Sequence, residues 1–403
     1  MSNPVYATTG YFLHGYGVKA QGNAGVAIAQ FQDSFTIANN PAGLSWVGSR
    51  VDVGATLFAP DRSAEITGNG AGADGQYNGN GRHYFVLPEF AISKQVNDTV
   101  ALGIAIYGNG GMNTGYKSNP YRAFGNSGTA GVDLTQIYIS PALAWRYAEN
   151  QSIGIGANFL YQIFEAKGVG GFGAYSSDSS NISNRGKDSS TGVGIRVGWA
   201  AQLTDRVTLG ANYSSKIKAD KFEKYQGLFA EGGGFDVPEN YGLGISFQAT
   251  PALNISADVQ RINYSDVASV GNRFSLDALL AGNIFGTQQG PGFGWRDINV
   301  YKLGVNYKVN QALTLRAGYS HNDQPIRSDQ TFLNILAPAV ITDHVSVGAT
   351  WNVDEQQEVS FAYTYGLKKR VNGSQSIPSA FGGGEANIEM QQHLLGVAYA
   401  YKF

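Results

Sequence analysis

The 403-residue chain contains no cysteine, so neither a disulfide framework nor a thiolate metal site can form. Charged residues make up only 14% of the chain and the net charge is −2, a balance that favours neither a nucleic-acid partner nor a disordered protein. No stretch approaches the ~20 consecutive apolar residues that a transmembrane helix needs, and the mean hydropathy is −0.18. These absences exclude a helical membrane protein.

Glycine and aromatic residues, in contrast, are abundant, with 54 Gly, 23 Tyr and 21 Phe. Transmembrane β-barrels have such a composition, because only one face of each strand meets lipid. The soluble alternative is a large β-sandwich or propeller, in which the same strands would turn their polar face to water. Aromatic residues near the expected strand ends favour the membrane, since aromatic girdles mark membrane interfaces: Trp145, Tyr147, Trp199, Tyr307, Trp351 and Phe403.

A polar turn followed by a strand of alternating apolar residues recurs along the chain. The turns lie at Asn97-Asp98, Glu149-Asn150, Asp205, Pro251, Asn310 and Asp354-Glu355. Their spacing of roughly fifty residues accommodates two strands of about ten residues and one long loop. Six turns join twelve strands, and segments near Val51–Phe58 and Gln391–Phe403 complete fourteen. The sequence therefore predicts an all-β membrane protein, a 14-stranded antiparallel transmembrane β-barrel over residues 49–403.

The last strand also indicates the compartment. Leu395, Val397, Tyr399 and Tyr401 share one face with the terminal Phe403. A final aromatic residue on such a strand resembles the signal that the barrel-assembly machinery of Gram-negative bacteria reads. The first residues, Met1–Val5, show no charged segment followed by an apolar core, so we expect a mature chain whose export signal has been removed.

Residues 1–48 lack strand alternation and are rich in small side chains. The bore of a 14-stranded barrel is too wide for wall side chains to fill. We therefore expect residues 1–48 to form a hatch of short helices and turns that plugs the barrel. The alternative is a periplasmic tail, although a segment this apolar would be poorly soluble outside the barrel.

Three segments of this front region carry a family resemblance: Gly10–Gly15, Gly22–Ala29 and Asn40-Pro41-Ala42-Gly43. They resemble the FadL family of outer-membrane transporters for long-chain fatty acids and aromatic hydrocarbons, in which Asn-Pro-Ala is a hallmark of the hatch. The resemblance implies passive uptake without ATP: apolar outer loops catch the ligand, the barrel passes it to the hatch, and a kink in the third strand releases it sideways into the membrane. Fatty acid, alkane and monoaromatic hydrocarbon all remain compatible with the sequence.

The expected third strand runs into Gly108, Asn109, Gly110, Gly111 and Met112. Closely spaced glycines usually mark bulges or bends. The segment could instead be the flexible top of a strand, but the family parallel favours a kink that opens laterally.

Long loops between the strands carry apolar residues that water-exposed loops normally avoid. Some follow helical spacing, in the segments 275–285 and 331–336. We predict a ligand groove formed by Phe172, Tyr175, Leu228, Phe229, Leu276, Leu279, Leu280, Ile284, Phe332, Ile335 and Leu336. The alternative is that these side chains only pack on one another.

Three cations are expected on the lumen face: Arg196, Lys302 and Arg316. A fatty acid would require an unpaired cation there, whereas a hydrocarbon would not. Asp258 and Glu89 also face inward and offer ion-pair partners instead.

Three other functions compete with transport of hydrophobic molecules. A general porin for polar solutes predicts an open bore. An adhesive or structural barrel predicts a bore that holds no ligand. An enzyme would need a catalytic constellation; His344 and Ser346 share a face, but no nucleophile elbow or phosphate-binding loop accompanies them. We therefore expect no enzyme, no cofactor, no metal and no nucleic acid, but a monomer surrounded by outer-membrane lipid and lipopolysaccharide, with detergent or lipid in its lumen after purification.

Overall fold

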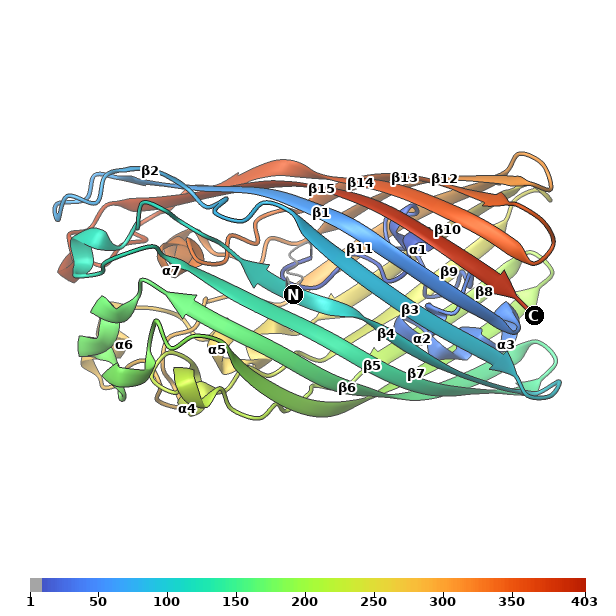
Figure 1. The fold of residues 1–403 in the computed structure, drawn as a ribbon, viewed down its shortest axis with the longest axis horizontal. Coiled ribbons are helices and arrows are strands. Elements are labelled where there is room, and N and C mark those ends of the chain that lie inside the picture. The colour runs from blue at the N-terminus through green and yellow to red at the C-terminus, as the bar shows by residue number, and fades with distance from the viewer. Residues whose placement is uncertain (1–8) are drawn as a thin grey trace.

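The computed structural model describes residues 9–403, so Met1–Val5 and the first eight residues of the expected hatch lie outside the described part. Within residues 9–403, fifteen strands form one antiparallel sheet, and β15 pairs with β1 to close a ring (Figure 1). Fourteen of them form the wall, while β2 extends the outer end of β1. The predicted 14-stranded barrel is confirmed.

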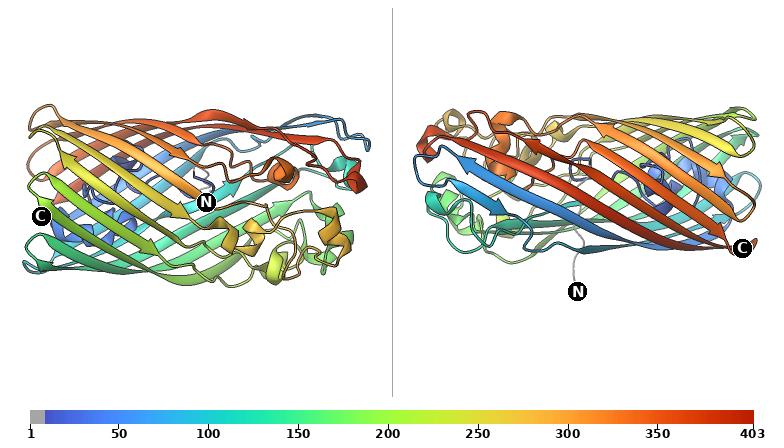
Figure 2. Two further views of the ribbon diagram at one scale, coloured as in Figure 1. Left: turned by 180° about the vertical axis from the view of Figure 1, so that it is seen from behind. Right: turned by 90° about the horizontal axis from the view of Figure 1, so that it is seen from above.

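The strands are β1 (Arg50–Thr67), β2 (Gly75–Asn78), β3 (Phe85–Gln95), β4 (Val100–Asn113), β5 (Gly131–Ala148), β6 (Gln151–Lys167), β7 (Asp188–Thr204), β8 (Val207–Ser214), β9 (Asn240–Gln248), β10 (Leu253–Ile262), β11 (Ile298–Lys308), β12 (Leu313–Asn322), β13 (Asp343–Asn352), β14 (Gln357–Val371) and β15 (Glu385–Lys402). All six predicted turns are present at one end of the barrel, and the long connections lie at the other (Figures 1 and 2).

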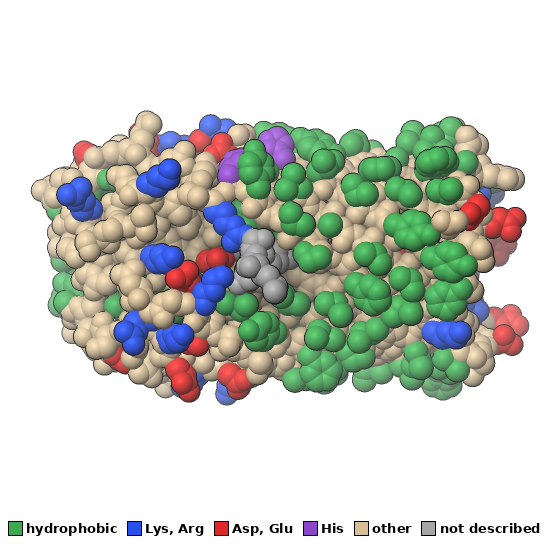
Figure 3. Space-filling model, viewed as in Figure 1, with side chains coloured by type: hydrophobic (Ala, Val, Ile, Leu, Met, Phe, Trp, Pro, Cys, Tyr) green, Lys and Arg blue, Asp and Glu red, His purple; other side chains and the backbone are tan. Residues whose placement is uncertain are grey.

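Alternation in the sequence corresponds to alternation in burial. In β15, Leu395 and Tyr399 are 52% and 44% exposed, whereas Leu394 and Ala400 are buried. Figure 3 shows the exposed apolar side chains gathered over the strands, with charged residues towards both ends. Such a band fits a lipid-facing wall, and closure from Arg50↔Lys402 to Thr67↔Glu385 leaves no sheet edge at this seam. Within residues 9–403, no helix is both long and apolar enough to cross a membrane.

The hatch segment, residues 9–48, lies inside the barrel towards the end with the tight turns (Figures 1 and 2). Its short elements are α1 (Val18–Gln21), α2 (Thr36–Asn39), η1 (Pro41–Gly43) and α3 (Leu44–Val47). Wall glycines make room for it: a Cβ on Gly154 would lie 2.7 Å from the carbonyl oxygen of Pro41, and one on Gly198 would lie 2.9 Å from Pro41 Cδ. The hatch backbone therefore packs directly against the wall backbone.

The outer loops contain short helical pieces: α4 (Ala230–Gly233), α5 (Ala268–Gly271), α6 (Leu276–Leu280), α7 (Thr331–Asn334), η2 (Arg122–Phe124), η3 (Gly170–Tyr175), η4 (Ser179–Asn181), η5 (Glu223–Tyr225), η6 (Tyr264–Asp266), η7 (Ser328–Gln330) and η8 (Ser379–Phe381). The helical spacing noted in 275–285 and 331–336 corresponds to α6 and α7. A cluster of buried aromatic rings joins these loops above the barrel.

Candidate functional site

The ladder between β3 and β4 is incomplete. The two strands pair from Gln95↔Ala101 to Phe90↔Ile106 and no further, while β4 continues along β5 with a register shift between Gly108 and Gly110. Residues 85–89 of β3 and 107–112 of β4 therefore face each other without ladder hydrogen bonds. We call this region the ladder break; at about 3.3 Å per residue it is roughly 16 Å tall.

Both ends of the ladder break are closed. The Phe90–Ile106 pair closes it on the turn side. On the loop side, Gly81 N donates to Gly115 O at 2.8 Å. The buried Arg62 guanidinium reinforces this closure by donating to Asn113 O at 2.6 Å and to Arg82 O at 2.5 Å. The break is thus a bounded gap in the hydrogen-bond ladder of the wall.

The first part of the hatch covers the ladder break from inside. We call Thr9–His14 the hatch tip. Gly111 N donates to Tyr11 O at 2.9 Å, and Leu13 N donates to Asn109 O at 3.3 Å, so the tip pairs with β4 where β3 does not. A Cβ on Gly110 would lie 3.2 Å from Tyr11 Cδ2 and closer still to the Tyr11 carbonyl. The glycines therefore let the tip approach β4.

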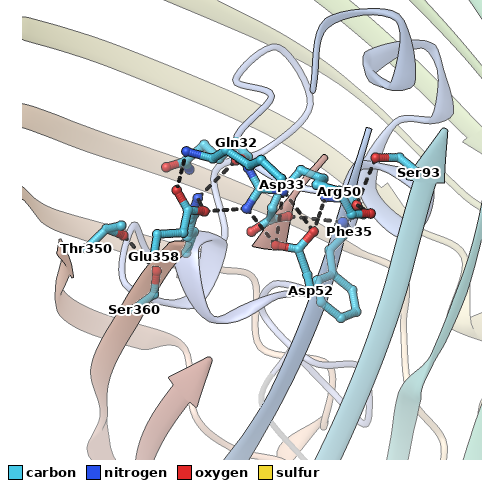
Figure 4. A network of polar contacts seen from close by, with 12 residues as sticks. Gln32, Asp33, Phe35, Arg50, Asp52, Ser93, Thr350, Glu358 and Ser360 are labelled. Carbon is cyan, nitrogen blue, oxygen red and sulfur yellow. Dashed lines mark hydrogen bonds and ion pairs between the residues drawn. The ribbon is translucent and has the colours of Figure 1, made fainter. Parts of the chain in front are cut away.

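The remainder of the hatch is anchored by buried charges (Figure 4). Glu358 on β14 pairs with Lys19 of α1 and with Arg50 of β1, and Arg50 also pairs with Asp52 at 2.6 Å. Asp52 in turn accepts a hydrogen bond from the backbone of Ser34 at 3.0 Å. A buried charge is costly unless it is paired, so this network fixes the hatch to the wall.

The Asn40-Pro41-Ala42 motif forms a second attachment. The Asn40 amide donates to Ile28 O at 2.7 Å and to Trp199 O of β7 at 3.0 Å. Its side-chain oxygen accepts from Ala42 N at 3.2 Å, which caps η1. The motif thus holds two parts of the hatch together and ties them to the wall.

An apolar cavity of about 40 Å³ lies among the outer loops. We call it the outer cavity; it is lined by Val132, Phe164, Val169, Phe172, Leu228, Phe229, Ser269, Phe285, Pro291, Gly292, Phe293, Leu333 and Leu336. Four of these were expected from the sequence: Phe172, Leu228, Phe229 and Leu336. The sequence reasoning missed the strand-end and loop aromatics, such as Phe164 and Phe293.

The other residues of the expected groove lie around this cavity without lining it. Phe332, Ile335 and Leu279 are buried in the same apolar cluster, and Tyr175 and Ile284 pack against it half-buried. The remaining two residues lie outside this cluster. Leu276 is half-buried, and Leu280 is 74% exposed, because α6 is a single short turn that can bury only one side.

A second cavity of about 20 Å³, the inner cavity, lies between the hatch and the wall. Phe12 and Leu13 of the tip line it, together with Ile28 and the cations Arg196 and Lys302. Arg196 donates to Ser214 Oγ at 2.7 Å and to the Tyr107 hydroxyl at 3.0 Å. Lys302 Nζ donates to the carbonyl oxygens of His14 at 2.9 Å and Gly25 at 3.2 Å. Within residues 9–403, neither cation forms an ion pair with a carboxylate.

The inward carboxylates bind the hatch backbone instead. Asp258 Oδ2 accepts from the amides of Ala27 and Ile28 at 2.8 and 3.0 Å, and Glu89 accepts from Val18 N at 3.0 Å. The third expected cation, Arg316, donates to Gln32 and Thr350 beside the anchoring network and does not line the inner cavity.

The catalytic alternative finds no support in the geometry. His344 contacts Gln392 Nε2 at 3.1 Å, whereas the Ser346 hydroxyl contacts Thr364 at 2.8 Å. His344 stacks on His14 of the hatch, with ring centroids 5.5 Å apart. Among residues 9–403, no group of three or more metal-ligating side chains is placed to hold an ion. These histidines form a contact between hatch and wall.

The fold is a closed barrel with a lipid-facing band and a folded segment in its bore, with one cavity among the outer loops and another between that segment and the wall. These features define the class as outer-membrane transport proteins. Comparison with known families agrees: residues 9–403 match the family described as outer membrane protein transport protein (OMPP1/FadL/TodX). The chain belongs to this FadL/TodX family and is a β-barrel of the Gram-negative outer membrane.

Individual relatives are distant. An outer-membrane protein of Neisseria meningitidis serogroup B is 24% identical over 98% of this chain and 95% of its own length. Two crystal structures share the fold: the Pseudomonas putida toluene transporter TodX (TM-score 0.72, 18% identity, 97% of this chain and 99% of that one) and a Pseudomonas aeruginosa FadL homologue (TM-score 0.74, 17% identity, 98% and 100%). The family comprises transport proteins, so this chain is grouped with channels and not with enzymes.

Proposed function

We propose that the protein is a passive uptake channel for hydrophobic small molecules that releases its cargo sideways through the ladder break. Cargo enters the outer cavity, moves to the inner cavity and leaves between β3 and β4 into the lipid. One observation carries this proposal: Phe12 and Leu13 line the inner cavity, and the same tip segment pairs with β4 across the break. The tip therefore lies between the inner cavity and the gap in the ladder.

The inner cavity favours an amphipathic acid as cargo. Arg196 and Lys302 lie beside apolar side chains of the tip and of Ile28. Among residues 9–403 Arg196 forms no ion pair, and Asp258 lies opposite Lys302 in the β10–β11 ladder while its Oδ2 binds the hatch backbone. A buried cation gains most from a charge-assisted hydrogen bond to a carboxylate. We propose a long-chain fatty acid, with its carboxylate at these cations and its chain along the tip.

A neutral aromatic hydrocarbon is the second candidate. The outer cavity is almost wholly apolar and is rich in phenylalanine rings, and one structural neighbour is a toluene transporter by name. Uptake of oleate and toluene by cells with and without the gene separates the two cargoes.

A reversible cross-link tests the exit route. The chain has no native cysteine, so Leu13→Cys and Asn109→Cys, placed where the tip bonds to β4, introduce the only two thiols. Joining them with a short bis-methanethiosulfonate reagent should stop uptake, and a reductant should restore it. The matched control is Ile217→Cys with Val237→Cys, an antiparallel bridge in the outer loops. Full uptake with the tip cross-linked would exclude exit through the ladder break.

We also propose that the protein works as a monomer among lipid and lipopolysaccharide, and that the assembly machinery reads its last strand. The exposed Phe403, directly after β15, and the outward alternation of that strand support this.

A further inference from the structure

The hatch tip is hydrogen-bonded to β4 and to Tyr264 of an outer loop. Tyr264, in the loop 263–297 that joins β10 to β11, is fully buried. Its hydroxyl donates to Thr9 O at 2.5 Å and accepts from Tyr11 N at 3.2 Å. Its ring packs on Tyr11 and Phe12, with centroids 5.2 and 5.8 Å apart. Tyr264 therefore clamps the backbone and the rings of the tip together.

The other end of the same loop lines the outer cavity, through Phe285 and Phe293. Trp295 connects the two ends: its ring lies 6.1 Å from Phe293 and 5.2 Å from Tyr264. It also lies 6.0 Å from Tyr11 of the tip. A continuous row of aromatic rings thus runs from the outer cavity to the ladder break, and one loop carries most of it.

We propose that Tyr264 is a latch that keeps the tip across the ladder break, and that cargo in the outer cavity opens the latch by displacing Phe293 and Trp295. The inference rests on the proposed function, because it specifies how cavity occupancy reaches the exit. Rings packed at interior density cannot admit a ligand without moving their neighbours, and packed elements shift between discrete arrangements. Tyr264 acts here as a positioning residue and does not itself bind cargo.

A thiol reporter in the tip measures the latch without requiring transport. Thr9→Cys suits this purpose, because Thr9 is 2% exposed and its carbonyl, which Tyr264 binds, is kept. In detergent-solubilised protein a water-soluble maleimide should label this thiol slowly, and added toluene should accelerate labelling. Tyr264→Phe removes two hydrogen bonds from the tip, so labelling without toluene should become about tenfold faster or more. In the Tyr264→Phe variant, toluene should not accelerate labelling further.

Two further variants distinguish the latch from general loosening. Gly10→Ala releases the tip from its own side, because Gly10 has φ +72° and a Cβ would lie 2.6 Å from Tyr264 Cε2. It should reproduce the fast labelling with Tyr264 intact. Tyr225→Phe is the matched control: Tyr225 is a buried loop tyrosine whose hydroxyl binds Gly186 O at 2.6 Å, and its loss should leave both rates unchanged.

Wild-type labelling rates in both Tyr264→Phe and Gly10→Ala would overturn the latch. Fast labelling that still responds to toluene would overturn the coupling to the outer cavity. Because labelling reports the tip and the cross-link experiment reports uptake, failure of the exit route would appear only in the second measurement.

Discussion

Neutralising Glu358 should free the hatch while leaving the barrel intact. Glu358 is the wall carboxylate that Lys19 of the hatch meets on docking, and the two side chains are only 4% and 8% exposed. In the Glu358→Gln variant, docking still buries the Lys19 ammonium but no longer provides an opposite charge. The fraction of molecules with an undocked hatch should therefore rise.

The magnitude follows from this burial. Removing one partner of a buried ion pair costs about 3–5 kcal/mol. Glutamine keeps one acceptor oxygen for Lys19, so the lower end of this energy range applies. Since about 1.4 kcal/mol changes an equilibrium tenfold, a loss of about 3 kcal/mol raises the undocked fraction on the order of 100-fold.

Planar-bilayer recording measures this fraction directly, because an undocked hatch leaves the bore of a 14-stranded barrel open to ions. We expect large-conductance openings to become on the order of 100-fold more frequent in Glu358→Gln. Glu65→Gln is the control, since Glu65 forms a partly exposed ion pair with Arg370, and ion pairs at the surface contribute little to stability. If the Glu358→Gln barrel is folded and shows large-conductance openings no more often than the wild type, the anchoring role of the network is refuted.

Two other predictions concern the cations of the inner cavity and the hatch. Replacing Arg196 and Lys302 together by Met should lower oleate uptake about tenfold or more through loss of charge-assisted hydrogen bonds and leave toluene uptake unchanged; equal loss for both cargoes would contradict the carboxylate site. Deleting residues 1–44 should convert a nearly silent channel into a steadily conducting one, whereas an already conducting full-length protein would favour a general porin.

The wall was predictable because its signals are local. Each polar turn, such as Asn97-Asp98, adjoins its own alternating strand, and the aromatic end at Phe403 belongs to the strand it marks. Alternation with a period of two is a property of consecutive residues, so one sequence suffices to read it.

The sequence indicated only one of the two strands that form the ladder break. The glycines of β4 indicated a bend, and the structure has a bulge between Gly108 and Gly110. The missing partner belongs to β3, where Pro88 lies within the unpaired stretch. Proline lacks an amide hydrogen and marks sheet edges, so Pro88 was a signal that the sequence reasoning overlooked.

The contacts that hold the hatch could not be read from the sequence. Lys19 and Glu358 are 339 residues apart, and Tyr264 meets Thr9 across 255 residues. Nothing local to either residue selects its partner. The same limit applies to the apolar residues with helical spacing in the loop, Leu276, Leu279 and Leu280. Helical spacing indicates that they share a side of a helix, but not how long the helix is or what covers that side.

The position of Glu358 also bears on the order of biogenesis. Its carboxylate, on β14, meets both Arg50 at the start of β1 and Lys19 of the hatch. Arg50 and Glu358 come together only when the C-terminal strands reach β1, since β15 lies between β14 and β1. Although the hatch is made first, its binding site is thus completed by the last step of ring formation. The arrangement therefore predicts that the hatch is anchored only once the ring has closed.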